Sequence, residues 1–458
     1  MHKRVIALAL LGCLLTGCSE SAAPQNTDAS SAAAVTALPT EIPTETEHSH
    51  TFGDWALKEA ASCSKNGVEE RICTGCQESE TRPTDTIPHD LNTYNICKKC
   101  QYVSFDPDAQ VVELGVFSNY YYTNSAIANY VWDVKIWGDL VYRGAGDYNK
   151  NAGTAPILAF NKETQHWVRM GITDDQALQR YVEIGGTLYA PGIDPNGSWS
   201  WGNFYMLDGE KWKKVRNLPG GIHNFDMIEF DGKIFAGLGT EVVDETIAVS
   251  EDGGKTFQFV PLYQDGMLFN LDSYKSSRTY EFVEYNGKLY AMVSFLVGIG
   301  YQHVIFCYDN GKMVYQGIAS GMSGGITSNR NYWSGKFEKD GICYITAGNL
   351  FAITDFANIA AREKIDMPND EKVADALLHN NTIYTLCYSQ KKNNSGYTIV
   401  VYQSATGKNG SFTEVVRCDY PAMPCSFDFD GEHFYIGTGY RPTDAAKSGM
   451  LLRVKPGT

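Results

Sequence analysis

Positive charge is scarce in this 458-residue sequence. It has 38 Lys and Arg residues against 53 Asp and Glu residues, which gives a formal net charge of −15 at pH 7. A protein that binds nucleic acid needs a basic surface to neutralise phosphate groups. The charge balance therefore argues against a nucleic-acid partner.

Long hydrophobic runs are also absent beyond the N-terminus. The one such run, from Val5 to Leu15, follows a short basic start and precedes small residues. At roughly ten residues it is too short to span a bilayer as a helix, and the pattern is typical of a secretion signal. The segment Leu15-Thr16-Gly17-Cys18 resembles the bacterial lipobox. That resemblance implies a lipoprotein signal peptide at 1–17, lipidation of Cys18, and a lipid-anchored protein at the extracellular face of the cell membrane.

Large apolar side chains are nearly missing from residues 18–46, which are rich in Ser, Ala, Thr and Pro. Such a segment cannot bury enough surface to offset the entropy of ordering, so we expect a disordered tether. The remaining chain divides into a small Cys-rich module at 47–105 and a larger domain at 106–458.

The Cys-rich module contains two Cys-x-x-Cys pairs separated by twenty residues, Cys73 with Cys76 and Cys97 with Cys100. This spacing predicts one tetrahedral site for a structural zinc ion, because each pair can present two thiolates from one tight turn. Export favours disulfides instead, and a reducing environment would leave free thiols. The spacing alone does not distinguish these three interpretations.

Other residues of the module strengthen the interpretation as a small repeat. His50 and His89 are further candidate ligands, and Cys63 is the fifth cysteine of the module. The stretch HTFGDW, followed by Cys63 and RICTGC, resembles small tandem repeats on surface proteins of anaerobic Gram-positive bacteria. The stretch PHDLNTYNICKKCQY resembles a truncated second copy. The resemblance covers residues 48–102 and implies no biochemical role.

A repeat of about fifty residues begins after Val111. Each copy has a turn of the Asp-Gly or Asn-Gly kind between two alternating apolar runs, the strongest local signal for a β-hairpin. An aromatic residue follows the turn at intervals of 40 to 55 residues, at Tyr142, Tyr189, Phe235, Tyr290, Tyr344, Tyr384 and Tyr435.

Most copies carry a second hairpin about twenty residues later, so that each copy supplies four antiparallel strands. Four strands repeated at this period predict an all-β protein with a β-propeller. The seven copies favour seven four-stranded blades, with six or eight as the alternatives. An open blade would expose an unpaired edge. We expect Val111 to Phe117 to close the ring against a last strand at Met450 to Val454.

The segment SEDGGKTF, from Ser250 to Phe257, resembles the Asp-box turn of sialidase-like propellers. The resemblance implies a turn between the third and fourth strands of a blade, in which Asp252 accepts backbone N–H groups and the aromatic residue packs between blades. SATGKNGSF resembles a degenerate copy with Thr406 in place of the aspartate. Asp252 is therefore interpreted as structural.

One face of the propeller gathers the loops between the second and third strands and the starts of the inner strands. Function concentrates on loops that a rigid scaffold holds in place. Aromatic rings stack on sugars and Arg side chains bind carboxylates, so these residues predict a site for a glycan, including an acidic one. The predicted ligand-binding residues are Trp132, Arg180, Trp199, Trp201, His223, Arg278, Arg330 and Trp333.

Three functions are compatible with this architecture. The first is a binding module for a surface ligand, most simply a glycan. The second is a sialidase-like glycoside hydrolase or lyase, but one well-formed Asp-box stands alone and the arginine motif near the start of that family is missing. The third is a scaffold for other surface proteins, because a fold does not determine a function.

Overall fold

The computed structural model is built almost entirely of strands and turns. It describes residues 49–116, 127–150, 153–240, 242–263, 274, 276–297, 300–320, 322, 333–440 and 447–457. These residues fall into two compact units, one comprising Glu70–Thr81 and the chain up to Ala56, the other comprising Leu57–Glu69 and Arg82–Thr458. Within these ranges, no helix has the length and apolar character needed to cross a membrane.

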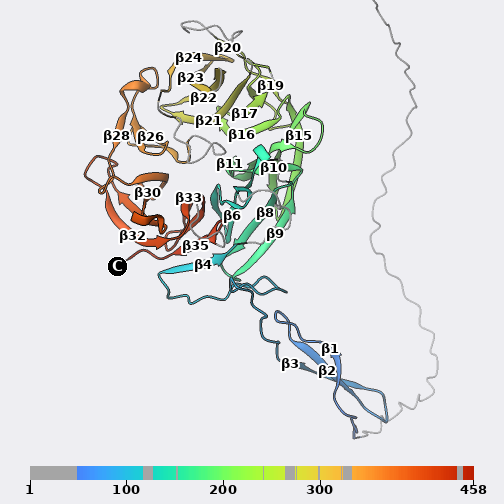
Figure 1. Cartoon of the computed structure of the whole chain (residues 1–458). Helices are drawn as coiled ribbons and strands as arrows, with labels where there is room; N and C mark the ends of the chain where they lie inside the picture. The colour runs from blue at the N-terminus through green and yellow to red at the C-terminus, as the bar shows by residue number, and fades with distance from the viewer. Residues whose placement is uncertain are drawn as a thin grey trace, which may run out of the picture. The chain divides into compact units, whose positions relative to one another are not determined.

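The larger unit is a ring of four-stranded antiparallel sheets (Figure 1). The first three sets are β5 (Val134–Trp137), β6 (Leu140–Arg143), β8 (Pro156–Asn161) and β9 (His166–Ile172); β11 (Val182–Ile184), β12 (Thr187–Pro191), β14 (Trp201–Asp208) and β15 (Lys211–Pro219); and β16 (His223–Phe230), β17 (Lys233–Thr240), β18 (Ile247–Ser250) and β19 (Gln258–Phe259).

The next three sets continue around the ring in sequence order. They are β21 (Ser277–Tyr285), β22 (Lys288–Val297), β23 (Gly300–Asp309) and β24 (Lys312–Ile318); β25 (Lys336–Lys339), β26 (Ile342–Thr346), β27 (Leu350–Ile353) and β28 (Glu363–Ile365); and β29 (Lys372–His379), β30 (Thr382–Gln390), β31 (Tyr397–Ser404) and β32 (Thr413–Tyr420). A short strand, β20 (Leu262–Tyr263), pairs in parallel with β24.

The last set joins the two ends of the ring. It consists of β33 (Met423–Phe429), β34 (Phe434–Tyr440), β35 (Leu451–Val454) and β4 (Val111–Gly115). Val454 pairs with Val111 and Leu451 with Gly115, so the predicted closing strand is confirmed. The predicted all-β propeller is confirmed as well, and the described strands form seven four-stranded sets.

The hairpin turns explain why the repeat folds in this way. Positive φ angles occur between the first and second strand of each set, for example 51° at Asp231 and 68° at Gly232, or 50° at Asn286 and 66° at Gly287. Two successive positive φ angles are typical of the type I′ turn, whose twist matches that of the strands. Each of the seven predicted aromatic residues lies on the second strand of its set.

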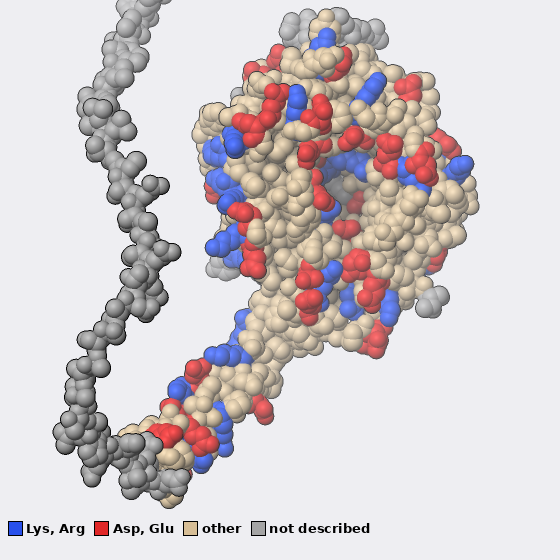
Figure 2. All heavy atoms as spheres, turned by 180° about the vertical axis from the view of Figure 1, so that it is seen from behind, with Lys and Arg blue, Asp and Glu red and all other residues tan. Residues whose placement is uncertain are grey.

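Carboxylates on or just before the inner strands link neighbouring blades. In each case an oxygen of the acidic side chain accepts a hydrogen bond from a backbone N–H group at the inner edge of another blade. These hydrogen bonds join blades that the chain connectivity alone would not hold together. The pairs are Asp133 with Tyr181 (2.7 Å), Asp226 with Phe282 (2.8 Å), Glu281 with Trp333 (3.1 Å), Asp375 with Phe427 (3.2 Å) and Asp428 with Ile136 (2.8 Å). Figure 2 shows the ring hollowed at its centre, with acidic and basic side chains around the hollow.

Three short strands join the loops of the first blades. β7 (Ala145–Gly146) pairs with β10 (Asp175–Leu178), which pairs with β13 (Ile193–Pro195), and Ile193 in turn pairs with His223 at the start of β16. Gly239 pairs with Arg278 across the next junction. This second layer of pairing fixes the loops that form the site below.

Outside the propeller sets, a three-stranded sheet has the order β1 (Ala56–Glu59), β2 (Gly67–Ile72), β3 (Ser79–Thr84). Residues after it pack on the first blade: Val103 donates to the Gln165 carbonyl at 2.8 Å, and Trp167 donates to the Gln101 carbonyl at 3.1 Å. Short 3₁₀ helices are η1 (Ile127–Asn129), η2 (Tyr148–Lys150), η4 (Ile359–Ala361) and η5 (Lys392–Asn394).

The turn at 250–257 has the predicted structure. It connects β18 to β19, the third and fourth strands of their set. Asp252 Oδ1 accepts the N–H groups of Lys255 at 3.0 Å and Thr256 at 2.9 Å. The Phe257 ring packs against Phe204 of the preceding blade, with centroids 6.0 Å apart. Asp252 therefore holds a turn.

Candidate functional site

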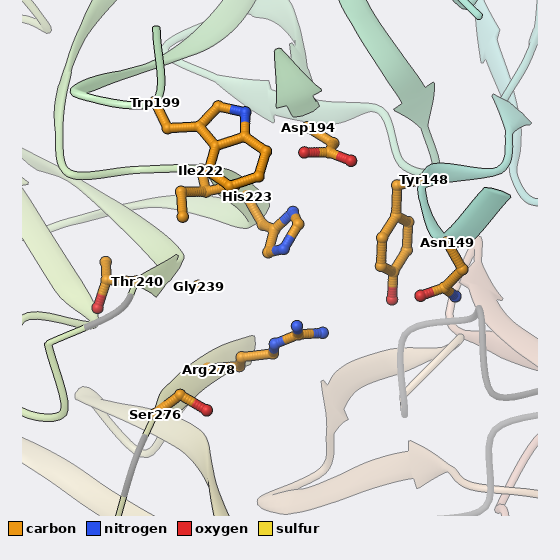
Figure 3. Close-up of a pocket in the computed structure, with 10 residues that line it drawn as sticks. All are labelled: Tyr148, Asn149, Asp194, Trp199, Ile222, His223, Gly239, Thr240, Ser276 and Arg278. Carbon is orange, nitrogen blue, oxygen red and sulfur yellow. The ribbon is translucent and has the colours of Figure 1, made fainter. Parts of the chain in front are cut away.

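A cavity of about 540 Å³ opens between the first four blades, and we call it the rim pocket (Figure 3). Its volume lies within the range of ~300–1,000 Å³ that is usual for small-molecule sites. It is lined by Tyr148, Asn149, Asp194, Trp199, Ile222, His223, Gly239, Thr240, Ser276 and Arg278.

The side chains of the rim pocket come from distant parts of the chain. Tyr148 lies on η2, Asp194 on β13, His223 at the start of β16 and Arg278 near the start of β21, while Trp199 precedes β14. The pairing of β13 with β16 and of β17 with β21 brings these segments together. Short strands and the starts of inner strands thus supply Asp194, His223 and Arg278, and a loop supplies Trp199.

Arg278 brings positive charge to the pocket. Its guanidinium lies toward the Tyr148 ring in Figure 3, 5.9 Å from the ring centroids of both Phe225 and Tyr301. It also donates to the Tyr280 hydroxyl, at a long 3.4 Å. Among the residues that the structure describes, Arg278 has no carboxylate partner at ion-pair distance. It is therefore available to an anionic group of a ligand.

His223 is neutral in this setting. Burial and the positive charge of Arg278 lower the pKa of His223 to about 3. Its Nδ1 atom is buried and has no hydrogen-bond partner within the described ranges. Since buried polar atoms are nearly always paired, this unpaired nitrogen is unusual.

Asp194 has the opposite shift. Burial and the neighbouring Asp175 carboxylate raise the pKa of Asp194 to about 6, although Arg278 acts against them. Asp175 is itself held by the Tyr205 hydroxyl at 2.5 Å and by the Asn203 amide at 2.9 Å. Asp194 also has a φ of 66°, a conformation that is uncommon for a residue other than glycine and that concentrates at functional sites.

A second cavity, of about 340 Å³, adjoins the first. It is lined by Trp199, Ser200, Gly220, Ile222, Thr240, Val242 and Glu245, so the two cavities share Trp199, Ile222 and Thr240. The Trp199 side chain is 53% exposed at this boundary. The surface can therefore accommodate more than one ring of a ligand, with an indole between the two parts.

The structure brings three of the predicted ligand-binding residues to the rim pocket, namely Trp199, His223 and Arg278. Trp201 is 47% exposed but is not among the residues that line either cavity. Arg330 lies outside the described residues, as does Cys18.

Three other predicted residues are buried in the ring. Trp132 donates its indole N–H to the Gly146 carbonyl at 2.8 Å, and the Trp333 side chain is fully buried. Both rings are packed in the protein interior, so the structure does not place them in the rim pocket. This agrees with the simpler expectation for a large aromatic residue on an inner strand.

Arg180 is also placed away from the pocket. With Asp226, Glu281 and Lys336 it forms what we call the channel ion cluster. Arg180 lies 3.0 Å from Asp226 and 2.6 Å from Glu281, and Lys336 contacts both carboxylates, at 3.0 Å from Glu281. Arg180 also donates to the Trp333 carbonyl at 2.8 Å. These contacts occupy its guanidinium.

Several lining residues were missed by the sequence interpretation. Tyr148, Asn149 and Asp194 lie in two of the loops that were expected on the ligand face, but short polar segments gave no reason to choose them. Thr240 lies within a pairing between blades, and Ser276 lies next to it; no local sequence pattern reveals this pairing. Sequence position therefore predicts which face of the propeller carries the pocket, but it identifies only some of the residues that line it.

The two Cys-x-x-Cys pairs, predicted to form one metal site, belong to two different groups of ligand atoms. Cys73 and Cys76 group with His50, and Cys97 and Cys100 group with Cys63 and His89. The residues present suit a metal ion, since thiolate and imidazole are the ligands that zinc prefers. Each pair therefore has its own candidate metal site.

Comparison with known proteins gives structural matches only. No protein-family model matches the chain, and no curated protein matches it. Among solved structures, "YCF48 bound to D1 peptide" is 11% identical with a TM-score of 0.44, covering 78% of this chain and 98% of the other.

Two further matches are similar in extent. The β-propeller domain of the Trilobed protease from Pyrococcus furiosus is 10% identical, with a TM-score of 0.38 over 68% of this chain and 89% of the other. The polysaccharide lyase Uly1 is 11% identical, with a TM-score of 0.41 over 74% of this chain and 93% of the other. Similarity this low assigns no function to this chain.

Proposed function

We propose that the propeller is a binding module whose rim pocket takes a carbohydrate that carries a carboxylate group. The observation that carries the proposal is Arg278, a partly buried cation without an ion-pair partner among the described residues, in a cavity that also contains an exposed indole.

Two kinds of contact support a sugar. The Trp199 face offers a surface for the C–H groups of a pyranose ring, and aromatic contacts of this type contribute ~0.5–1.5 kcal/mol beyond burial. Around it, Asn149, His223, Thr240 and Ser276 offer hydrogen-bonding groups for hydroxyls. A carboxylate on the sugar would pair with the Arg278 guanidinium through charge-assisted hydrogen bonds.

The proposal extends to the location of this binding. The signal-like N-terminus and Cys18 suit a lipid anchor in the membrane, with residues 18–46 as a tether. A propeller held in this way would present its pocket to glycans outside the cell. A surface scaffold for proteins is the alternative, and the experiment below distinguishes the two.

The test is a glycan array probed with the purified full-length chain, followed by calorimetric titration with the best ligand. Trp199→Ala is expected to weaken binding about tenfold, whereas Trp201→Ala, an equally exposed indole outside the cavities, is the matched control and leaves it unchanged. Arg278→Met is expected to lower affinity for acidic sugars about 10- to 150-fold, which corresponds to ~1.5–3 kcal/mol.

Two outcomes would contradict the proposal. Equal loss of affinity in both Trp variants would remove the rim pocket as the site. Silence across the array, together with capture of a defined protein ligand that Arg278→Met does not affect, would favour the scaffold.

A second candidate is elimination chemistry on the same acidic glycan, favoured by the position of His223, Asp194 and Arg278 around one cavity. His223 would accept the proton from the carbon beside the carboxylate while Arg278 neutralises the developing charge. The C–O bond to the leaving sugar would break with its electron pair on oxygen, and protonated Asp194 would supply the proton. The new double bond, conjugated with the carboxylate, absorbs in the ultraviolet, so a flat absorbance trace with a bound glycan limits the function to binding.

A further inference from the structure

The two Cys-x-x-Cys segments form the same tight turn. In the first, Gln77 donates its backbone N–H to the Cys73 carbonyl at 3.0 Å, and in the second Gln101 donates to the Cys97 carbonyl at 2.9 Å. Both glutamines have a φ of 66°. The two segments therefore share one turn geometry, and in each of them the turn directs both thiols to the same point.

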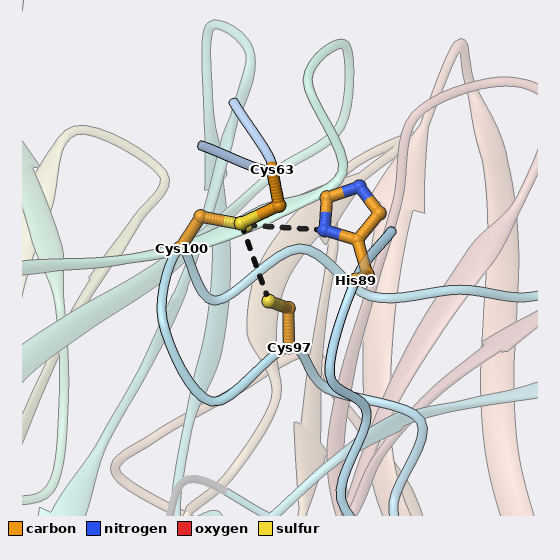
Figure 4. Close-up of side chains that lie close together, drawn as sticks. All are labelled: Cys63, His89, Cys97 and Cys100. Carbon is orange, nitrogen blue, oxygen red and sulfur yellow. Dashed lines mark hydrogen bonds between the residues drawn. The ribbon is translucent and has the colours of Figure 1, made fainter. Parts of the chain in front are cut away.

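The second turn is completed by two residues from earlier in the chain. Cys63 Sγ lies 3.7 Å from Cys97 Sγ, and Cys100 Sγ lies 3.4 Å from His89 Nδ1 (Figure 4). All four ligand atoms lie within 4.8 Å of one another, and Cys63 and Cys97 are buried. The His89 ring stacks on Tyr102 with centroids 4.5 Å apart, which fixes its orientation.

These distances match the edges of a zinc tetrahedron. Zn–S bonds of ~2.3 Å and Zn–N bonds of ~2.05 Å at the tetrahedral angle place two sulfurs ~3.8 Å apart and a sulfur and a nitrogen ~3.6 Å apart. A disulfide would need ~2.05 Å between its sulfurs. The group is therefore spaced for coordination to a metal ion rather than for an S–S bond.

The first turn is completed differently. Cys76 Sγ lies 3.3 Å from His50 Nδ1, and Cys73 completes a group of three ligand atoms within the described ranges. The other ring nitrogen of His50 contacts the Glu78 carboxylate at 3.1 Å. A carboxylate behind a histidine is the usual outer support of a zinc ligand.

We propose that the chain holds two zinc ions, one in a closed site made by Cys63, His89, Cys97 and Cys100, and one in an open site made by His50, Cys73 and Cys76. The closed site is structural, and in the open site the described residues supply three of the four ligands of a tetrahedral ion. Each set is drawn from one compact unit. Together they use all five cysteines between 63 and 100, which an arrangement of disulfides cannot do.

The arrangement has a simple physical basis. Strands β1 to β3 are short and mostly exposed, so this part of the chain has little apolar surface to bury and needs a cross-link. The closed site is partly buried, whereas His50 and Cys76 are exposed. We therefore expect zinc to leave the open site more readily.

The test is metal analysis of the full-length chain purified under reducing conditions and supplied with Zn²⁺. Two zinc ions per chain are expected. Cys63→Ser and Cys76→Ser should each lower the content by one, and Cys418→Ser, which changes a cysteine on β32 outside both groups, should leave two. A chromophoric chelator should remove one ion quickly and the second slowly, and Cys76→Ser should abolish the fast phase.

Titration of the unmodified chain with Co²⁺ tests the proposal even if the cysteine variants do not fold. We expect saturation at two equivalents, with a thiolate charge-transfer band and the intense visible bands of tetrahedral cobalt. Saturation at one equivalent, or loss of both ions in Cys63→Ser while Cys76→Ser keeps two, would overturn the proposal. So would a Cys63–Cys97 disulfide in peptides from protein that binds no metal. These measurements do not depend on glycan binding. A negative result for zinc would therefore not contradict the function proposed for the rim pocket.

Discussion

Replacing Arg180 with Met tests whether the channel ion cluster holds the propeller together. The cluster contains two cations, Arg180 and Lys336, and two carboxylates, Asp226 and Glu281, whose side chains are at most 1% exposed. Its formal charge is zero. Removing the guanidinium leaves one uncompensated negative charge away from water, at the junction of several blades.

The expected cost follows from that imbalance. Breaking a buried ion pair by deleting one partner costs ~3–5 kcal/mol, because the remaining charge is not solvated. A domain has a total stability of only ~5–15 kcal/mol. We therefore expect Arg180→Met to lower the free energy of unfolding by about 3–5 kcal/mol. Adding Glu281→Gln restores neutrality, so the double variant should be more stable than the single one.

Urea unfolding followed by tryptophan fluorescence measures this difference, provided that the dependence on denaturant is unchanged. The matched control is Lys391→Met, which removes a cation 2.7 Å from Asp419 at the surface and should cost no more than ~1 kcal/mol. If Arg180→Met costs no more than Lys391→Met, or if adding Glu281→Gln lowers stability further, the reasoning fails. Loss of glycan affinity with full stability would return Arg180 to the ligand site.

Two further predictions concern the turn at 250–257 and the acid response of the pocket. Asp252→Ala removes an acceptor of two backbone N–H groups and should lower the free energy of unfolding, whereas Thr406→Asp in the degenerate copy should raise it or leave it unchanged. A gain in stability of Asp252→Ala, measured by urea unfolding, would contradict this. Because the folded pKa of His223 is about 3 against ~6.5 when unfolded, the folded state should lose stability as pH falls below ~6.5, by at most ~1.4 kcal/mol per pH unit, and His223→Gln should reduce that slope. Since the pKa of Asp194 is about 6, affinity for an acidic sugar should fall as pH rises through 6 and Asp194 ionises, and titration of Asp194→Asn should show no such fall.

The ring could be predicted because its signals are local. Each unit is marked by a turn and an aromatic residue on the following strand, as at Asp231, Gly232 and Phe235. The closing pair of Val111 and Val454 followed from the need to cover an edge. The strands β7, β10 and β13 could not be predicted, since they pair loop with loop across blades and carry no periodic pattern.

The pocket was predicted only in part for a related reason. Arg180 lies just before the inner strand β11, and Arg278 is the second residue of the inner strand β21. Yet Arg180 lies among Asp226 and Glu281, whereas Arg278 lies among aromatic rings. Their surroundings come from other blades, so the sequence around each arginine does not distinguish them. The sequence around Cys63 likewise does not show which cysteines it approaches. Its neighbour, Cys97, lies some thirty residues further along the chain and is brought to it by the fold.

The joining of β4 to β35 constrains the order in which this protein can mature. Residues 111–115 leave the ribosome long before residues 451–454, so the former must wait without their neighbour while more than three hundred residues are made. Contacts of such long range form slowly, and unpaired strands are prone to aggregate meanwhile. A truncation that removes β35 should therefore impair both ends of the propeller at once. Strand β4 would then be left as an exposed edge, the part of the propeller most in need of a chaperone.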